Sequence, residues 1–255
     1  MANTRVRTGA VVLGVVVAGL CAAWLGASMT PPERPAASAA SVTPTAAGPG
    51  VVEDPAPEAP ASADAVQTGD TVGALAMLAG VPSDASWQGT GGRYDRDAFG
   101  ERWADVDGNG CDTRNDVLRR DLTQVVLRDG SGCKVLSGML RDPYTGATVD
   151  FVSGEDTSPL VPIDHVVALA WAWRHGADTW TPEQRLAFAN DPRNLVATTH
   201  DVNQDKADAG PAEWLPPDEA AHCEYAEQYV AVLAAWRLTV DAADRATLTK
   251  ALQVC

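Results

Sequence analysis

The stretch from Val161 to Lys206 carries side chains suited to chemistry on phosphate esters. It places Asp164 next to His165 and ends with Asn203 and Lys206. A carboxylate can hold a hard cation through oxygen, and a carboxamide oxygen can add a second, uncharged ligand. An imidazole can take a proton from water near neutral pH. These residue types predict a one-metal phosphodiesterase site, with Asp164 and Asn203 on the metal and His165 beside the water.

Two oxygen ligands that share one negative charge favour Mg²⁺ or Mn²⁺ over Zn²⁺. Lys206 follows Asn203 by three residues, so both lie on one face of a helix. From that face the ammonium would touch the scissile phosphate as a point charge. The alternative is that Asp164 and His165 form a buried pair that only holds the end of a strand.

Three short motifs follow one another here: Asp164-His165, Asn194-Leu195, and Asn203 to Lys206. Their order resembles that of the HNH, or His-Me finger, endonucleases, in the branch of the GmrSD C-terminal domain with its many secreted bacterial members. The resemblance covers about Arg93 to Cys255. It implies an α+β fold with a ββα-metal core, extended by further helices and a β-hairpin and stapled by disulfides.

The resemblance also implies roles and a substrate. The histidine at His165 would be the general base, and Asn194 would brace the hairpin loop that orients it. The substrate would be DNA, with RNA as the open alternative, cut with little sequence preference. Members of this branch share the stretch around Arg114, which would bring that guanidinium to the cleft as a phosphate clamp.

A second metal site is predicted upstream by a D-x-D-x-N-G pattern. Its oxygen ligands would be Asp105, Asp107, Asn109 and, at position 12, Asp116. This is the opening of a calcium loop, although position 12 usually carries Glu. The alternative is an acidic turn that caps the next helix. The corresponding alternative function is a catalytically inactive, extracellular, calcium-stabilised binding domain.

Four cysteines follow the N-terminal region: Cys111, Cys133, Cys223 and Cys255. An even set in an exported domain predicts two disulfides, and four cysteines allow three pairings. We favour Cys111–Cys133 and Cys223–Cys255, because each pair brackets one local segment.

The N-terminal region has the character of a targeting segment. An uncharged run from Gly9 to Met29 follows Arg5 and Arg7, which predicts a signal peptide or an N-terminal membrane anchor over residues 1–30. Residues 31–70 are rich in Pro and Ala and predict a disordered linker. Residues 71–255 would form the nuclease-like domain. The protein would be secreted, or held on the outer face of the membrane by its N-terminal segment, and no protein partner is implied.

The net charge of −15 argues against a broad basic surface that clings to nucleic acid. It is compatible with an enzyme that touches a few phosphates through a metal and one or two basic side chains.

The pattern of apolar residues and turn signals predicts the elements that position these residues. Helices are expected over 71–80, 94–103, from 112, over 166–175 and 182–189, from 202, and over 219–236 and 241–252. Strands are expected near 123–127, 133–140, 146–154, 160–165 and 194–198.

Overall fold

The computed structural model describes residues 71–83 and 92–255 of the 255-residue chain. It combines helices with two small sheets, so the predicted α+β class is confirmed. The segments predicted as signal or anchor (residues 1–30) and as linker (residues 31–70) lie outside the described residues. Within the described ranges, no helix has the length and apolar character needed to cross a bilayer.

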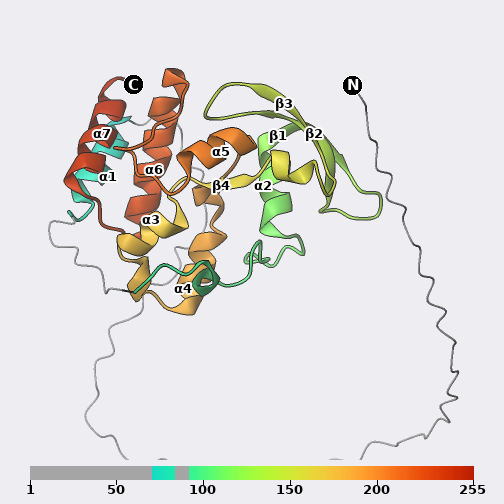
Figure 1. Cartoon of the computed structure of the whole chain (residues 1–255), viewed down its shortest axis with the longest axis horizontal. Helices are drawn as coiled ribbons and strands as arrows, with labels where there is room; N and C mark the ends of the chain where they lie inside the picture. Colours follow the sequence, from blue (N-terminus) through green and yellow to red (C-terminus); the bar gives the residue numbers. More distant parts are fainter. Residues whose placement is uncertain (1–70, 84–91) are drawn as a thin grey trace, which may run out of the picture. The chain divides into compact units, whose positions relative to one another are not determined.

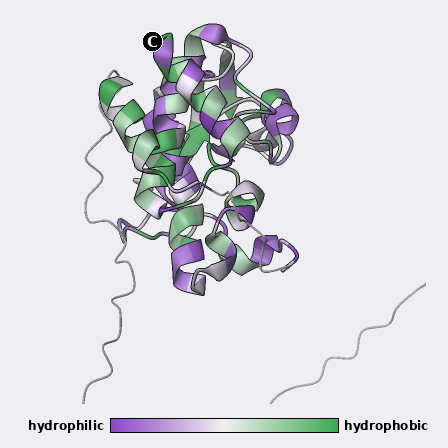
Figure 2. Ribbon diagram, turned by 90° about the vertical axis from the view of Figure 1, so that its left-hand side faces the viewer, coloured by the Kyte–Doolittle hydropathy of each residue, from purple (hydrophilic) through white to green (hydrophobic). Residues whose placement is uncertain are grey.

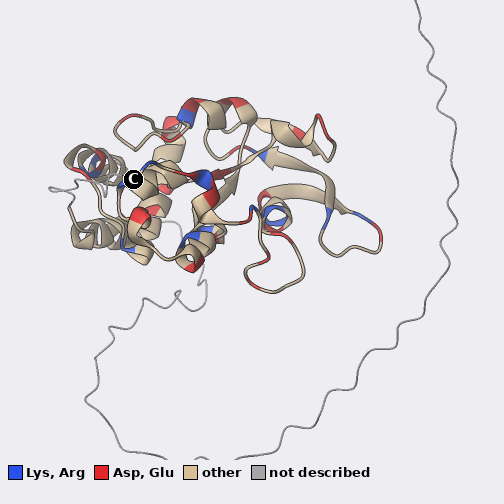
Figure 3. Cartoon of the chain, turned by 60° about the horizontal axis from the view of Figure 1, so that its bottom comes forward, with Lys and Arg blue, Asp and Glu red and all other residues tan. Residues whose placement is uncertain are grey.

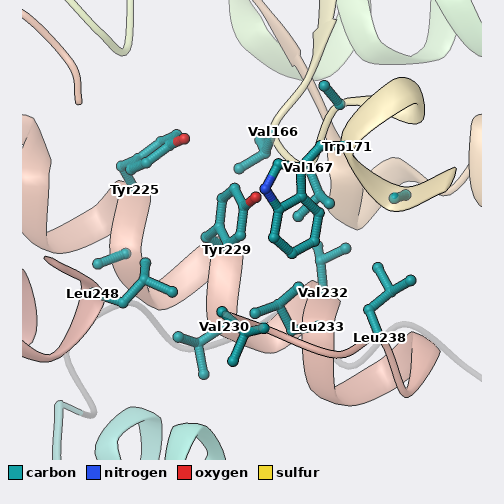
Figure 4. Packing of buried hydrophobic residues seen from close by; sticks show 14 of the residues in the cluster. Val166, Val167, Trp171, Tyr225, Tyr229, Val230, Val232, Leu233, Leu238 and Leu248 are labelled. Carbon is teal, nitrogen blue, oxygen red and sulfur yellow. The ribbon is translucent and has the colours of Figure 1, made fainter. Parts of the chain in front are cut away.

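One side of the domain is helical (Figure 1). Its helices are α1 (Thr71–Gly80), α3 (Leu169–Arg174), α4 (Pro182–Ala189), α6 (His222–Trp236) and α7 (Ala242–Gln253). Most of these helices carry both hydrophilic and hydrophobic residues (Figure 2), as expected when one face is buried. Trp171 of α3 and Tyr229 of α6 lie next to each other in the shared core (Figure 4), with their rings edge to face at a centroid distance of 5.5 Å.

The other side is built on a sheet. Strands β1 (Leu122–Leu127), β2 (Val135–Arg141) and β3 (Thr148–Val152) pair antiparallel in the order β1-β2-β3. Helix α2 (Thr113–Asp121) packs against this sheet (Figure 1) and buries Val117 and Leu118 in a second, smaller core.

Between the two sides lie β4 (Ile163–His165), β5 (Leu195–Ala197) and α5 (His200–Lys206). The two strands pair antiparallel, with Asp164 opposite Val196. Ile163 belongs to the core of the sheet side, whereas Val202 of α5 belongs to the helical core. Residues of this junction therefore pack against both the sheet core and the helical core.

Short 3₁₀ helices complete the fold. They span Arg96–Phe99, Ser158–Leu160, Ala177–Thr179, Pro192–Asn194 and Glu219–Ala221.

Capping residues set the helix starts that the sequence predicts. Asp112 caps α2 by accepting a hydrogen bond from the backbone N–H of Asn115. Thr181 and Gln184 form a capping box at α4, with Pro182 at the first helical position. Asp241 caps α7. The helices that begin at these caps are confirmed.

Two predicted helices are shorter than expected. Instead of a helix over 94–103, the chain forms only the 3₁₀ turn Arg96–Phe99, because Gly100 (φ 71°) and Trp103 (φ 60°) adopt left-handed backbone conformations. Instead of starting at 166, α3 starts at Leu169, because the backbone of Val167 is hydrogen-bonded to a side chain from another part of the chain.

Both favoured disulfides are confirmed. Cys111–Cys133 joins the loop before α2 to the loop before β2, and Cys223–Cys255 joins the start of α6 to the end of α7. Each side of the domain thus contains one disulfide.

Candidate active site

The junction of β4, β5 and α5 is held in place by α2 and the turn after β2. Asp121, at the end of α2, accepts a hydrogen bond from the backbone N–H of Ala197 (2.7 Å). The buried carboxylate of Asp142 accepts from the Thr198 hydroxyl (2.8 Å) and the Thr199 N–H (2.6 Å), just before α5. Burial alone would raise the pKa of Asp142, but these hydrogen bonds outweigh it and hold the pKa below its usual value. These hydrogen bonds attach β5 and the start of α5 to α2 and to the turn after β2.

Asp164 lies at the centre of this junction and is 5% exposed. Its Oδ2 accepts a hydrogen bond from the Tyr144 hydroxyl (2.8 Å), and Lys206 Nζ lies 3.1 Å from Oδ1 and 3.0 Å from Oδ2. Burial raises the pKa of Asp164, and the Lys206 ammonium opposes that rise. The carboxylate is thus matched by one positive charge inside the protein.

The position of Lys206 differs from the expected contact with phosphate. Its side chain is fully buried, and Nζ donates to the backbone carbonyl of His165 (2.8 Å) as well as to Asp164. The spacing from Asn203 does place both residues on α5, but the carboxylate of Asp164 draws the ammonium inward. Lys206 stabilises the junction and does not line the cavity described below.

His165 ends β4, and its ring is fixed by one hydrogen bond. Nε2 lies 2.9 Å from the backbone carbonyl of Ala189, and the ring is stacked at 12° to Trp103 with centroids 6.3 Å apart. Burial, together with the positive charges of Arg96, Lys206 and Arg102, lowers the pKa of His165 to about 4, although the hydrogen bond to Ala189 opposes this shift. The imidazole is therefore neutral at physiological pH.

Asn194 is fully buried and holds the loop that follows β4. Its Oδ1 accepts from the N–H of Val167 (2.8 Å), and its Nδ2 donates to the carbonyl of the same residue (3.1 Å). Its own backbone carbonyl accepts from the N–H of Val166 (2.9 Å). These bonds explain why residues 166–168 stay outside α3.

A cavity of about 480 Å³ opens at this junction. Asp164, His165 and Asn203, which the sequence analysis singled out, all line it. Two further charged residues line it that the sequence did not indicate, Arg96 and Asp208. Their signal was weak, because both lie outside the three motifs and a lone Arg or Asp is usually a surface residue.

Arg114 does not line this cavity, in contrast to its expected role as a phosphate clamp. Its Nη2 donates to the carbonyls of Ser158 (3.1 Å) and Val161 (2.9 Å), and burial lowers its pKa. The guanidinium instead fastens α2 to the chain that leads into β4.

The acidic loop before α2 is folded around Asn109. Asn109 Nδ2 donates to Asp107 Oδ2 (3.0 Å) and Asp116 Oδ2 (3.1 Å), while the two oxygens of Asp105 accept from the N–H groups of Asn109 and Gly110. Three residues of the calcium pattern therefore lie in one exposed loop, and the fourth, Asp116, faces them from the first turn of α2. They are separate from the cavity at His165.

Comparison with known proteins identifies the class to which this site belongs. The family model for the C-terminal domain of GmrSD restriction endonucleases matches residues 112–251. Since this match covers more than half of the chain, the protein belongs to that family, and the family indicates a nuclease.

A relative supports the same assignment at the level of the sequence. The chain is 43% identical over 170 residues to a protein of Arthroderma benhamiae (strain ATCC MYA-4681 / CBS 112371) named "Uncharacterized secreted protein", covering 66% of this chain and 78% of the relative. No solved structure matches the chain.

Proposed function

We propose that this domain is an exported, divalent-metal-dependent endonuclease of the His-Me finger type that hydrolyses phosphodiester bonds in DNA. The observation that carries the proposal is that His165, Asp164 and Asn203 line one cavity, where the antiparallel pair of β4 and β5 meets the helix that follows β5. RNA is a second substrate under this proposal, because the chemistry at phosphorus is the same. Asn194 supports the site by holding the loop behind His165.

His165 is suited to remove a proton from an attacking water. When Nε2–H donates to the Ala189 carbonyl, the lone pair of the neutral ring is on Nδ1. The low pKa keeps that nitrogen unprotonated at neutral pH, so it is available as a general base. The carbonyl of Ala189 would also stabilise the ring once Nδ1 has taken the proton.

The residues present fit a hard cation that keeps several water ligands. Carboxylate oxygens can accept several hydrogen bonds or ligands, so Asp164 retains a lone pair beyond those used by Tyr144 and Lys206. Asn203 offers a carboxamide oxygen to the same cavity. This oxygen donor set suits Mg²⁺ or Mn²⁺, which would supply charge stabilisation at the phosphate.

Three features support an extracellular place of action. The N-terminal pattern is that of a signal peptide or anchor, the domain holds two disulfides, and the Arthroderma benhamiae relative bears the name of a secreted protein. Acidic side chains are spread over many of the described elements (Figure 3), so binding to nucleic acid should be weak outside the site.

The test is nicking of a supercoiled plasmid by the purified protein with Mg²⁺ or Mn²⁺. His165→Ala should lower the rate by a factor of about 10²–10⁴, the usual contribution of a general base. His200→Ala is the matched control, because His200 is exposed on α5 and should leave the rate unchanged. Equal rates for wild type and His165→Ala, or no nicking across a series of divalent metals, would refute the proposal.

The acidic loop supports calcium binding as a second property of the domain. Asp107 and Asp116 both accept a hydrogen bond from Asn109 Nδ2, so their carboxylates lie on either side of one amide group, which a cation would have to displace in order to bind both. If the loop bound calcium and the cavity proved inactive, the protein would be the calcium-stabilised binding domain considered above.

A further inference from the structure

The cavity at His165 is lined by an arginine with one unpaired, buried guanidinium nitrogen. Arg96 belongs to the 3₁₀ turn Arg96–Phe99 and lines the cavity. Its Nη1 atom is buried and makes no hydrogen bond to any of the residues that the structure describes. A buried guanidinium nitrogen without an acceptor is uncommon in proteins, because burying an unpaired charged donor is costly.

The negative charges that line the cavity are already matched by other groups. Asp164 is paired with Lys206, and Asp208 is paired with Arg174 at 2.8 Å. Neither of the two carboxylates that line the cavity therefore forms an ion pair with Arg96. Asp97, the next residue in the chain, is exposed, and its charge offsets that of Arg96 only in part, since the pKa of Arg96 stays lowered.

A second arginine, Arg102, lies a few residues further along the chain and is exposed. The pKa of Arg96 is lowered chiefly by the burial of Arg96 itself and further by the positive charge of Arg102. The same charge contributes to the lowered pKa of His165. Two guanidinium groups held near each other repel unless an anion lies between or beside them.

We propose that Arg96 and Arg102 form a phosphate-binding subsite beside His165. Arg96 holds the phosphate inside the cavity through the paired N–H groups of its guanidinium, and Arg102 holds a neighbouring phosphate of the same strand at the rim. The identity of the ligand as a nucleic-acid strand rests on the proposed nuclease function. Anion binding itself needs neither metal nor cleavage.

Under this proposal, Arg96 and Arg102 bind phosphate in place of Arg114 and Lys206, the two basic residues that the sequence predicted for this role. Arg114 is committed to the carbonyls of Ser158 and Val161, and Lys206 is committed to Asp164. Arg96 reaches the cavity because the left-handed conformation at Gly100 ends its 3₁₀ turn and keeps the segment from continuing as a helix.

The first experiment measures anion binding without catalysis. Pyrophosphate is titrated into the purified full-length protein in EDTA by calorimetry, at constant ionic strength. Arg96→Ala should weaken binding by about tenfold or more, whereas Arg96→Lys should retain part of it, because the charge remains but the planar fork is lost. Arg128→Ala is the charge-matched control on an exposed loop and should bind as wild type does.

The second experiment measures binding of a short DNA oligonucleotide in EDTA as a function of salt. Each lost phosphate contact should reduce the slope of log K against log salt by about 0.7–0.9, so the double variant Arg96→Ala/Arg102→Ala should lose about 1.5. Arg128→Ala should keep the wild-type slope. Thermal melting of each variant verifies that it is folded.

The outcomes separate the two proposals. Pyrophosphate binding that depends on Arg96 in a protein that never nicks DNA would support the subsite and remove the nuclease function. Nicking by wild-type protein, together with Arg96→Ala and Arg102→Ala variants that bind pyrophosphate and DNA as wild type does, would overturn the subsite and leave the nuclease function standing.

Discussion

The helical side and the sheet side of the domain are stabilised by different means. The helical core is large and rich in aromatic rings, among them Trp171, Tyr225 and Tyr229. The sheet core is small, and its strands leave Val126 and Val152 more than half exposed. Polar contacts and a disulfide therefore contribute more to the stability of the sheet side. One such contact is the hydrogen bond from the Val135 N–H to the Asn115 side chain.

The difference shows why the candidate site depends on buried polar groups. His165 and Asp164 stand where neither core is complete, because Ile163 packs into one core and Val166 into the other. The hydrogen bonds and the ion pair of Tyr144, Asp164, Lys206 and Asn194 join the two sides at this point. The following predictions test how the two sides are connected, beginning with the largest expected effect.

Lys206→Met should destabilise the whole domain by about 3–5 kcal/mol, because it leaves the buried carboxylate of Asp164 without its counter-charge. Chemical denaturation measures the loss. Lys250→Met, at an exposed position of α7, is the control and should change stability by less than about 0.5 kcal/mol. Adding Asp164→Asn to Lys206→Met should restore part of the loss; a single variant as stable as wild type would show that the ion pair does not connect the two sides.

Removing the disulfide of the sheet side with Cys111→Ser/Cys133→Ser should cost about 3 kcal/mol, given a sequence separation of 22 residues. Because the sheet core is small, the backbone amides of β1 to β3 in this variant should exchange with solvent well before those of α6 do. The matched variant Cys223→Ser/Cys255→Ser should lower the stability of the helical side instead. Uniform exchange in both variants would contradict the distinction between the two sides.

Acid should weaken the helical side through His175, whose ring stacks on Trp171 at 3.7 Å. Burial lowers the pKa of His175 to about 4, and Arg174 adds to this while Asp241 opposes it. Because the unfolded histidine has a pKa near 6.5, the unfolded chain gains its proton first as the pH falls. Stability present above about pH 6.5 is therefore lost progressively toward pH 4, by roughly 2 kcal/mol at pH 5.

The measurement is the free energy of unfolding of wild type and His175→Gln at pH 7.5 and pH 5. The wild type should lose about 2 kcal/mol more than the variant, which cannot titrate at this position. Parallel losses in both proteins would show that His175 is not the group responsible.

Tyr144→Phe should cost about 1.5 kcal/mol, because the hydroxyl donates to the charged Asp164. Tyr225→Phe is a closely matched control: its ring lies 5.8 Å from that of Tyr144, and its buried hydroxyl has no hydrogen-bond partner among the described residues. That variant should be neutral or slightly stabilising. Equal effects of the two substitutions, measured by denaturation, would remove Tyr144 from the polar connection.

Calcium should raise the melting temperature by a few degrees through the acidic loop of the sheet side, the smallest of these effects. Asp107→Asn should abolish the shift, whereas Asp129→Asn, on the exposed loop between β1 and β2, should not. The absence of any shift with millimolar calcium would leave the loop as a helix-capping turn.

Local signals in the sequence predicted much of the fold. The caps Asp112, Thr181 and Asp241 set the starts of their helices, and spacing along the chain identified both disulfides. The candidate cavity was harder to predict, because a side chain's partner is decided by tertiary packing. The motif placed Lys206 correctly on α5, but only the fold shows that Asp164 draws its ammonium into the interior. Arg96 carried no motif, and its exposure to the cavity depends on the left-handed residues that follow it.

The way α1 is fastened has a mechanical consequence. Arg245 of α7 donates to the carbonyls of Leu78 and Val81, and the Val240 N–H donates to the carbonyl of Pro82. Tension applied through the residues before Thr71 is therefore transmitted into the helical core, and α1 contributes no residue to the cavity at His165. A force applied at Thr71 would therefore act first on the helical core, ahead of the strands that carry Asp164 and His165.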